Sequence, residues 1–95
     1  MSLEFEKAID CYTRCIPHVP ESDHTMRTVV YSNRAQCYIK IEKYDNAYKD
    51  ADKALTYDPS HIKSLQRRAT SAYYTKRLRQ ARKDFMHCLS IEFTD

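Results

Sequence analysis

The sequence predicts an all-α protein, an antiparallel solenoid of helix hairpins with five helices in about two and a half repeating units. Three observations lead to this prediction. The 95 residues include no glycine and only three prolines, which disfavours an all-β fold with many tight turns. Apolar residues recur three and four positions apart in five separate segments. Related residues also recur 34 positions apart, a period typical of stacked helix–turn–helix units.

The first predicted helix covers residues 4–16, and Pro17 and Pro20 end it because proline cannot extend a helix. Its apolar stripe consists of Phe5, Ala8, Ile9, Tyr12, Cys15 and Ile16. In this reading Cys15 is a small core residue and Cys11 flanks it.

The second predicted helix covers residues 22–40, and the stretch Pro20-Glu21-Ser22-Asp23 supplies its N-cap chemistry. Its apolar face includes Met26, Val30, Ala35, Cys37, Tyr38 and Ile41. A short turn at residues 42–45 leads to the third helix, over about 45–56.

The third and fourth helices are separated by Tyr57-Asp58-Pro59-Ser60, where proline stops one helix and Ser60 is expected to cap the next. The fourth helix is predicted over 60–75 and the fifth over 78–91, after a turn at 75–77. Without glycine, none of these helices can end at a glycine stop.

The repeat is visible in residue pairs 34 positions apart. The pairs are Asn33 and Arg67, Ala35 and Ala69, Tyr44 and Leu78, Ala47 and Ala81, Asp50 and Asp84, and Leu55 and Leu89. The first helix fits the same repeat at an offset of 39 residues, so that Phe5 is equivalent to Tyr44 and Ala8 is equivalent to Ala47. The five additional residues fall in the connection 17–25, where an insertion costs little.

The chain resembles the tetratricopeptide repeat (TPR) family. The residues that carry this resemblance are Tyr31, Ala35, Tyr38, Ala47, Ala54 and Pro59 in the middle repeat and Leu65, Ala69, Ala81 and Phe85 in the last. The resemblance implies one domain over 4–93, with the second helix of repeat one at 4–16, repeat two at 22–57 and repeat three at 60–91. Small residues at Ala35 and Ala47 would let the two helices of one repeat approach closely.

The resemblance also implies that two elements of the family pattern are missing, the first helix of the first repeat and a final capping helix. The helix at 4–16 would then lack its usual partner and expose its apolar stripe. We therefore expect a dimer or higher oligomer, with exchange of helices as one route.

The resemblance is closest to a TPR subfamily of co-chaperones around residues 31–35 and 63–69. These proteins bind the acidic C-terminal tails of cytosolic heat-shock chaperones of the seventy- and ninety-kilodalton classes through a cluster called the carboxylate clamp. Asn33, Lys63 and Arg67 match three clamp positions, and Gln66 is expected to line the same groove. The other two members, a lysine and an asparagine, belong to the missing first helix, so the clamp is expected to be partial.

The spacing of these residues suits the binding of a carboxylate. Lys63 and Arg67 are four residues apart and share one helix face, whereas Arg68 points about 100° away and is left outside the groove, like Arg34. Arginine presents a planar fork that matches a carboxylate, and the asparagine amide can donate a hydrogen bond without adding charge.

The formal net charge of +3 is unevenly distributed, since residues 59–83 contain eight basic residues and no acidic one. Five of these bases are expected on the convex side of the last repeat: Lys76, Arg77, Arg79, Arg82 and Lys83. This surface could be solvated, meet an acidic protein surface or bind nucleic acid. No zinc finger, homeodomain or RNA-binding signature accompanies it, and five of the eight tyrosines fall on packing positions, namely Tyr12, Tyr31, Tyr38, Tyr44 and Tyr48.

The sequence indicates no enzyme, cofactor or metal site. No histidine is spaced with a cysteine and an acid as a nucleophile and base would be, and no Cys-x-x-Cys is present. Without a signal peptide or an apolar run of about 20 residues, we expect a cytoplasmic protein with reduced thiols and no membrane partner. Two alternatives remain open, a TPR scaffold that binds an unrelated protein in an assembly complex and a basic helical module for nucleic acid.

Overall fold

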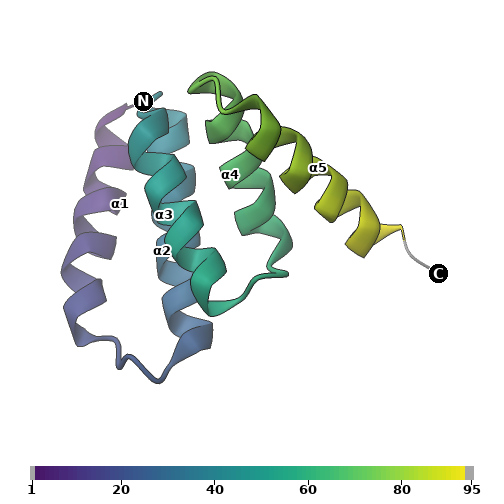
Figure 1. Ribbon diagram of the computed structural model, residues 1–95. Helices are drawn as coiled ribbons and strands as arrows, with labels where there is room; N and C mark the ends of the chain where they lie inside the picture. The colour runs from purple at the N-terminus through teal and green to yellow at the C-terminus, as the bar shows by residue number, and fades with distance from the viewer. Residues whose placement is uncertain (1, 94–95) are drawn as a thin grey trace.

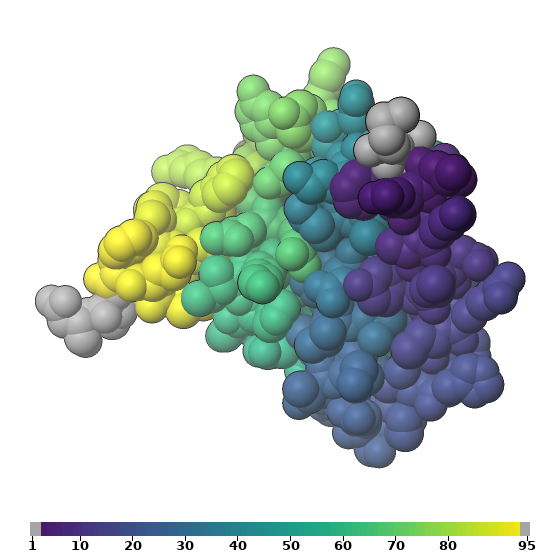
Figure 2. All heavy atoms as spheres, turned by 180° about the vertical axis from the view of Figure 1, so that it is seen from behind, coloured from purple at the N-terminus to yellow at the C-terminus, as the bar shows by residue number. Residues whose placement is uncertain are grey.

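A computed structural model describes residues 2–93, and in that range the chain forms five α-helices and one short 3-10 helix. The elements are α1 (Ser2–Cys15), η1 (Ile16–His18), α2 (His24–Lys40), α3 (Tyr44–Tyr57), α4 (Ile62–Tyr74) and α5 (Leu78–Glu92). Consecutive helices run back and forth as antiparallel hairpins, and α5 leans away from the others toward its C-terminal end (Figure 1). From the opposite side, the surface passes from α1 through α2 and α4 to α5 (Figure 2). The all-α hairpin arrangement predicted from the sequence is confirmed.

Alanines at the helix crossings hold the hairpins together. Ala35 of α2 and Ala47 of α3 are completely buried, and the equivalent residues of the next hairpin, Ala69 of α4 and Ala81 of α5, are 0% and 4% exposed. Side chains without branches let two helices approach closely. The larger core residues cluster where α3, α4 and α5 meet, around Leu65.

Two helices begin at capping residues close to those expected. Asp23 caps α2, because its Oδ1 accepts a hydrogen bond from the Met26 amide at 3.0 Å, and the helix starts at His24. The expected cap of α4 at Ser60 is wrong. The cap is His61, whose Nδ1 accepts from the Ser64 amide at 3.3 Å.

No helix ends at a glycine, as expected, but two helices still end in the left-handed conformation that glycine usually supplies. Glu42 after α2 and Lys76 after α4 adopt φ values of 62° and 64°, a region that favours glycine. The amide of Lys43 donates to the Tyr38 carbonyl at 2.8 Å, and the amide of Arg77 makes the matching bond to the Ala72 carbonyl at 2.7 Å. Both stops are therefore Schellman motifs, built with a charged residue in the strained position and repeated 34 residues apart.

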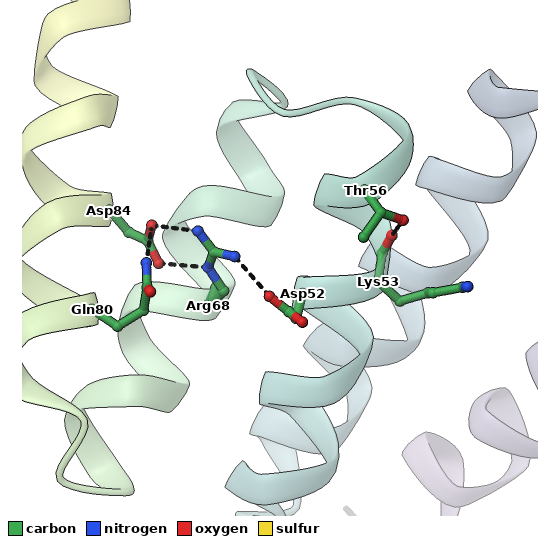
Figure 3. A network of polar contacts seen from close by, with 6 residues as sticks. All are labelled: Asp52, Lys53, Thr56, Arg68, Gln80 and Asp84. Carbon is green, nitrogen blue, oxygen red and sulfur yellow. Dashed lines mark hydrogen bonds and ion pairs between the residues drawn. The ribbon is translucent and has the colours of Figure 1, made fainter.

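A second repeated feature is an arginine that joins each first helix to the second helix of its hairpin. Arg34 forms two hydrogen bonds to the carboxylate of Asp50, at 2.7 and 2.8 Å. Arg68 does the same with Asp84, both at 2.8 Å, and also donates to Asp52 at 2.8 Å (Figure 3). The two arginines are 34 residues apart, as are the two aspartates, but the sequence analysis noted only the spacing of the aspartates.

Several expectations about burial differ from the structure. Cys15 is exposed rather than a core residue, and Met26 on α2 is 46% exposed. The described apolar side chains of α1 are at most half-buried, and α1 packs mainly against α2. The five tyrosines expected at packing positions are all half-buried. Among the described residues, no helix is long and apolar enough to cross a membrane.

Candidate functional site

Arg67 of α4 lies against α2 and contacts one other predicted site residue, Asn33. Its Nη1 donates to the Ser32 carbonyl and to the Ser32 hydroxyl, both at 2.9 Å, and more weakly to Asn33 Oδ1 at 3.4 Å. Ser32 is almost completely buried, so it anchors the guanidinium from the α2 side. The structure therefore brings Asn33 and Arg67 together on the face shared by α2 and α4.

The surroundings of Arg67 differ from those of its neighbour Arg68. Arg34 and Arg68 each face a buried carboxylate, whereas Arg67 contacts only neutral acceptors among the described residues. Burial lowers the pKa of Arg67 below its ordinary value, and the nearby Cys37 and Tyr12 offset this only in part. Arg67 is thus a half-buried cation that has no counter-ion within residues 2–93, an arrangement that a bound carboxylate would stabilise.

The other two predicted site residues, Asn33 and Lys63, differ in their relation to Arg67, because only Asn33 contacts it. The Asn33 oxygen accepts from Arg67, which leaves the amide N–H groups to donate to a ligand. Lys63 is exposed one turn before Arg67, in the first turn of α4, where the helix dipole adds to its attraction for an anion. The structure shows no direct contact of Lys63 with the other two. Gln66, which precedes Arg67 in the sequence, is exposed.

A small hollow lies beside the start of α4, and none of Asn33, Lys63 and Arg67 lines it. It is lined by His24, Thr25, Thr28 and Val29 of α2 and by Tyr57, Asp58 and His61 at the α3–α4 connection. Val29 is 40% exposed and offers an apolar surface there. The sequence analysis did not single out Val29 or Ser32; Ser32 could have been found because it stands next to Asn33 on the same helix.

The basic stretch at 59–83 divides into paired and unpaired residues. Arg77 approaches Asp45 at 3.4 Å, and its guanidinium lies 4.2 Å from the centre of the Tyr48 ring. Arg68 is held by two aspartates, as described above. By contrast, Arg79, Arg82 and Lys83 are exposed and form no ion pair with another residue in the range 2–93.

The cysteines are separated by their positions in the fold. Cys11 and Cys15 are exposed on α1, whereas Cys37 and Cys88 are buried, and burial raises the pKa of both buried thiols. Within the described part of the chain, no three histidine, cysteine, aspartate or glutamate side chains gather as a metal site would require.

Comparison with known proteins gives one family match and several similar structures. The family model described as "Tetratricopeptide repeat" matches residues 28–61. Protein unc-45 homolog B of Danio rerio is 40% identical over 89 residues, which is 94% of this chain and 10% of that protein. The chain spans about a tenth of the length of the curated relatives that it matches first.

Two solved structures are similar over nearly the whole chain. The second TPR of Spaghetti (RPAP3), bound to the HSP90 peptide SRMEEVD, is 38% identical in sequence and has a TM-score of 0.82. The match covers 93% of this chain and 77% of that chain. The second TPR domain of human RPAP3, in complex with the HSP70 peptide SGPTIEEVD, is 35% identical in sequence and has a TM-score of 0.83. The match covers 96% of this chain and 72% of that chain.

Proposed function

The chain belongs to the tetratricopeptide repeat family, and we propose that it is a co-chaperone-type module that holds the acidic C-terminal tail of a heat-shock chaperone. The ligand is a chaperone of the seventy- or ninety-kilodalton class, and the site of action is the cytoplasm. The related domains support this ligand, since the HSP90 and HSP70 peptides bound to them both end in Glu-Glu-Val-Asp.

The single observation that carries the proposal is the half-buried Arg67, which has no carboxylate partner in the part of the chain that the structure describes. A cation that is partly removed from water costs free energy unless an anion or several acceptors compensate it. Arg34 of α2 and Arg68 of α4 already have their carboxylates inside the protein. Arg67 is left for a carboxylate supplied from outside.

The binding mode follows from the donors that remain free. Arg67 uses only Nη1 in its contacts with α2, so Nε and Nη2 can donate to one ligand carboxylate. Asn33 donates to the terminal carboxylate from its amide, and Lys63 pairs with an acidic side chain one helical turn away. Each such bond to a charged group contributes about 1.5–3 kcal/mol, which suits a roughly micromolar ligand.

Calorimetric titration with the peptide SRMEEVD tests the proposal. The free-acid peptide is expected to bind, and amidation of its C-terminus is expected to weaken binding by at least about tenfold, the equivalent of one charged hydrogen bond. Arg67→Ala should cause a similar loss. Lys49→Ala, which removes an exposed cation from α3, is the matched control and should leave the affinity unchanged.

The outcome also separates the two alternatives. If amidation and Arg67→Ala have no effect, the chain is a TPR scaffold for another protein and the carboxylate clamp is refuted. If an oligonucleotide binds more tightly than the peptide and its log affinity falls steeply with log salt, the nucleic-acid alternative replaces the proposal.

A further inference from the structure

Two arginines on the first helices of the hairpins show how this protein holds a carboxylate. Arg34 donates from Nε and Nη2 to the two oxygens of Asp50, at 2.7 and 2.8 Å, so one edge of the guanidinium grips the carboxylate as a fork. Arg68 holds Asp84 with the same two atoms, both at 2.8 Å (Figure 3). Two parallel charge-assisted hydrogen bonds make such a pair strong and directional.

In both pairs the remaining guanidinium nitrogen has an acceptor of its own. Nη1 of Arg34 donates to the Thr13 hydroxyl at 3.1 Å, and Nη1 of Arg68 donates to Asp52 at 2.8 Å. A guanidinium that is bonded at Nη1 is restrained from turning its Nε–Nη2 edge away from the carboxylate. The carboxylate fork of this protein therefore has two parts, an edge that binds and an anchor at Nη1 that orients it.

Arg67 has the anchor of such a fork, but no residue in the range 2–93 supplies its carboxylate. Its Nη1 donates to the hydroxyl and to the carbonyl of Ser32, both at 2.9 Å, whereas its Nε and Nη2 form no hydrogen bond within that range. Ser32 is 1% exposed, so the packing of α2 fixes its position. Ser32 thus stands to Arg67 as Thr13 stands to Arg34.

The anchor of Arg67 differs in charge from that of Arg68. Asp52 brings a negative charge to Nη1 of Arg68, whereas both acceptors that Ser32 offers are neutral. Asn33 Oδ1, the more distant acceptor at 3.4 Å, is neutral as well. A neutral anchor orients the guanidinium without cancelling its charge, so that charge stays available for a ligand carboxylate.

We propose that Ser32 is the positioning residue of the candidate site. By holding Nη1 of Arg67, it presents the Nε–Nη2 edge to a ligand carboxylate in the geometry of the two internal arginine–aspartate pairs. This inference rests on the proposed function, because it states how Arg67 receives the acidic tail. A lysine at position 67 would not reproduce the arrangement, since an ammonium group has no planar edge.

Peptide titration with matched serine variants tests this role. Ser32→Ala removes the hydroxyl anchor. Its control is Ser71→Ala, which removes the hydroxyl of a completely buried serine that has no hydrogen-bond partner in the described part of the chain. Ser32→Ala should weaken binding of free-acid SRMEEVD by about three- to tenfold, the equivalent of one hydrogen bond, whereas Ser71→Ala should leave it within about twofold. In an Arg67→Ala chain, Ser32→Ala should cause no further loss, because no guanidinium remains to be positioned.

Nitrogen-15 NMR of the arginine side chains gives a second readout, which a merely structural role of Ser32 would not change. In the peptide-free chain, the Nη signals of Arg67 should be separate at low temperature, because the bonded guanidinium rotates slowly. In Ser32→Ala they should merge. The signals of Arg34 and Arg68 are the internal reference and should be unaltered, and Arg67→Lys identifies the Arg67 signals by their disappearance.

The results separate this inference from the proposed function. If the unaltered chain binds free-acid and amidated peptide equally, the proposed function fails, and the role of Ser32 in binding fails with it. If the unaltered chain binds as proposed but Ser32→Ala binds like Ser71→Ala, only the role of Ser32 is overturned. An equal loss from Ser32→Ala with and without Arg67, or separate Arg67 signals that persist in Ser32→Ala, would overturn it as well.

Discussion

Substitution of the adjacent residues Arg67 and Arg68 by alanine should have opposite consequences. Arg68 is 18% exposed and its partner Asp84 is 3% exposed, so Arg68→Ala leaves a buried carboxylate without a counter-ion. Removing one partner of a buried pair costs about 3–5 kcal/mol. Because a domain of this size is stable by about 5–14 kcal/mol, this change removes a large part of its free energy of unfolding.

Arg67→Ala removes no carboxylate pair. The loss is limited to hydrogen bonds with neutral acceptors, worth about 1 kcal/mol, and the removal of an uncompensated half-buried cation offsets some of it. The free energy of unfolding should therefore differ between the two variants by at least about 2 kcal/mol.

Urea unfolding followed by far-ultraviolet circular dichroism measures this difference, with equal m-values as the check that both variants lose the same structure. Peptide titration under conditions where both variants are folded supplies the second readout. Arg68→Ala should bind SRMEEVD like the unaltered chain, whereas Arg67→Ala should not. Equal destabilisation by the two substitutions, or loss of binding in Arg68→Ala alone, would refute this assignment of roles.

Three further predictions concern the helix stop, the thiols and association. Lys76→Gly should raise the free energy of unfolding by about 0.5–1 kcal/mol, because glycine adopts a positive φ without strain. Lys76→Ala should give no such gain, and the midpoints of denaturant unfolding measure the difference. At pH 8, exposed Cys11 and Cys15 should react with a maleimide faster than buried Cys37 and Cys88, whose raised pKa leaves less thiolate; mass spectrometry of the folded protein would reveal any reversed order. Light scattering should show a dimer or larger species, and a monomer at high concentration would disprove association through α1.

Much of the fold follows from short-range patterns in the sequence. The spacing of apolar residues and the 34-residue recurrence located all five α-helices to within about two residues, the usual uncertainty of helix ends. The alanines predicted to lie at the helix crossings do lie there, because only small side chains let two helices approach that closely. These features depend on neighbouring residues and on helix geometry alone.

The capping residues show where local patterns become ambiguous. Ser60 and His61 both have side chains that can accept an amide hydrogen bond, and the sequence does not distinguish them. The choice depends on where the α3–α4 connection places the first turn of α4. Likewise, the positive φ at Glu42 and Lys76 arises because packing fixes the direction of the following helix, even though no glycine is available.

Arg67 and Arg68 show most clearly what the sequence determined and what the tertiary structure decided. The helical period predicted that their side chains point about 100° apart. The sequence analysis accordingly placed Arg67 on the face of the predicted groove and Arg68 outside it. Only the packed structure shows that Arg68 meets Asp84 and Asp52 while Arg67 meets neutral oxygens of α2. The physical reason is that an ion pair requires two groups from different helices to converge. A one-dimensional pattern gives the face on which a charge lies, but tertiary packing determines whether that charge is neutralised inside the protein or remains available to a ligand.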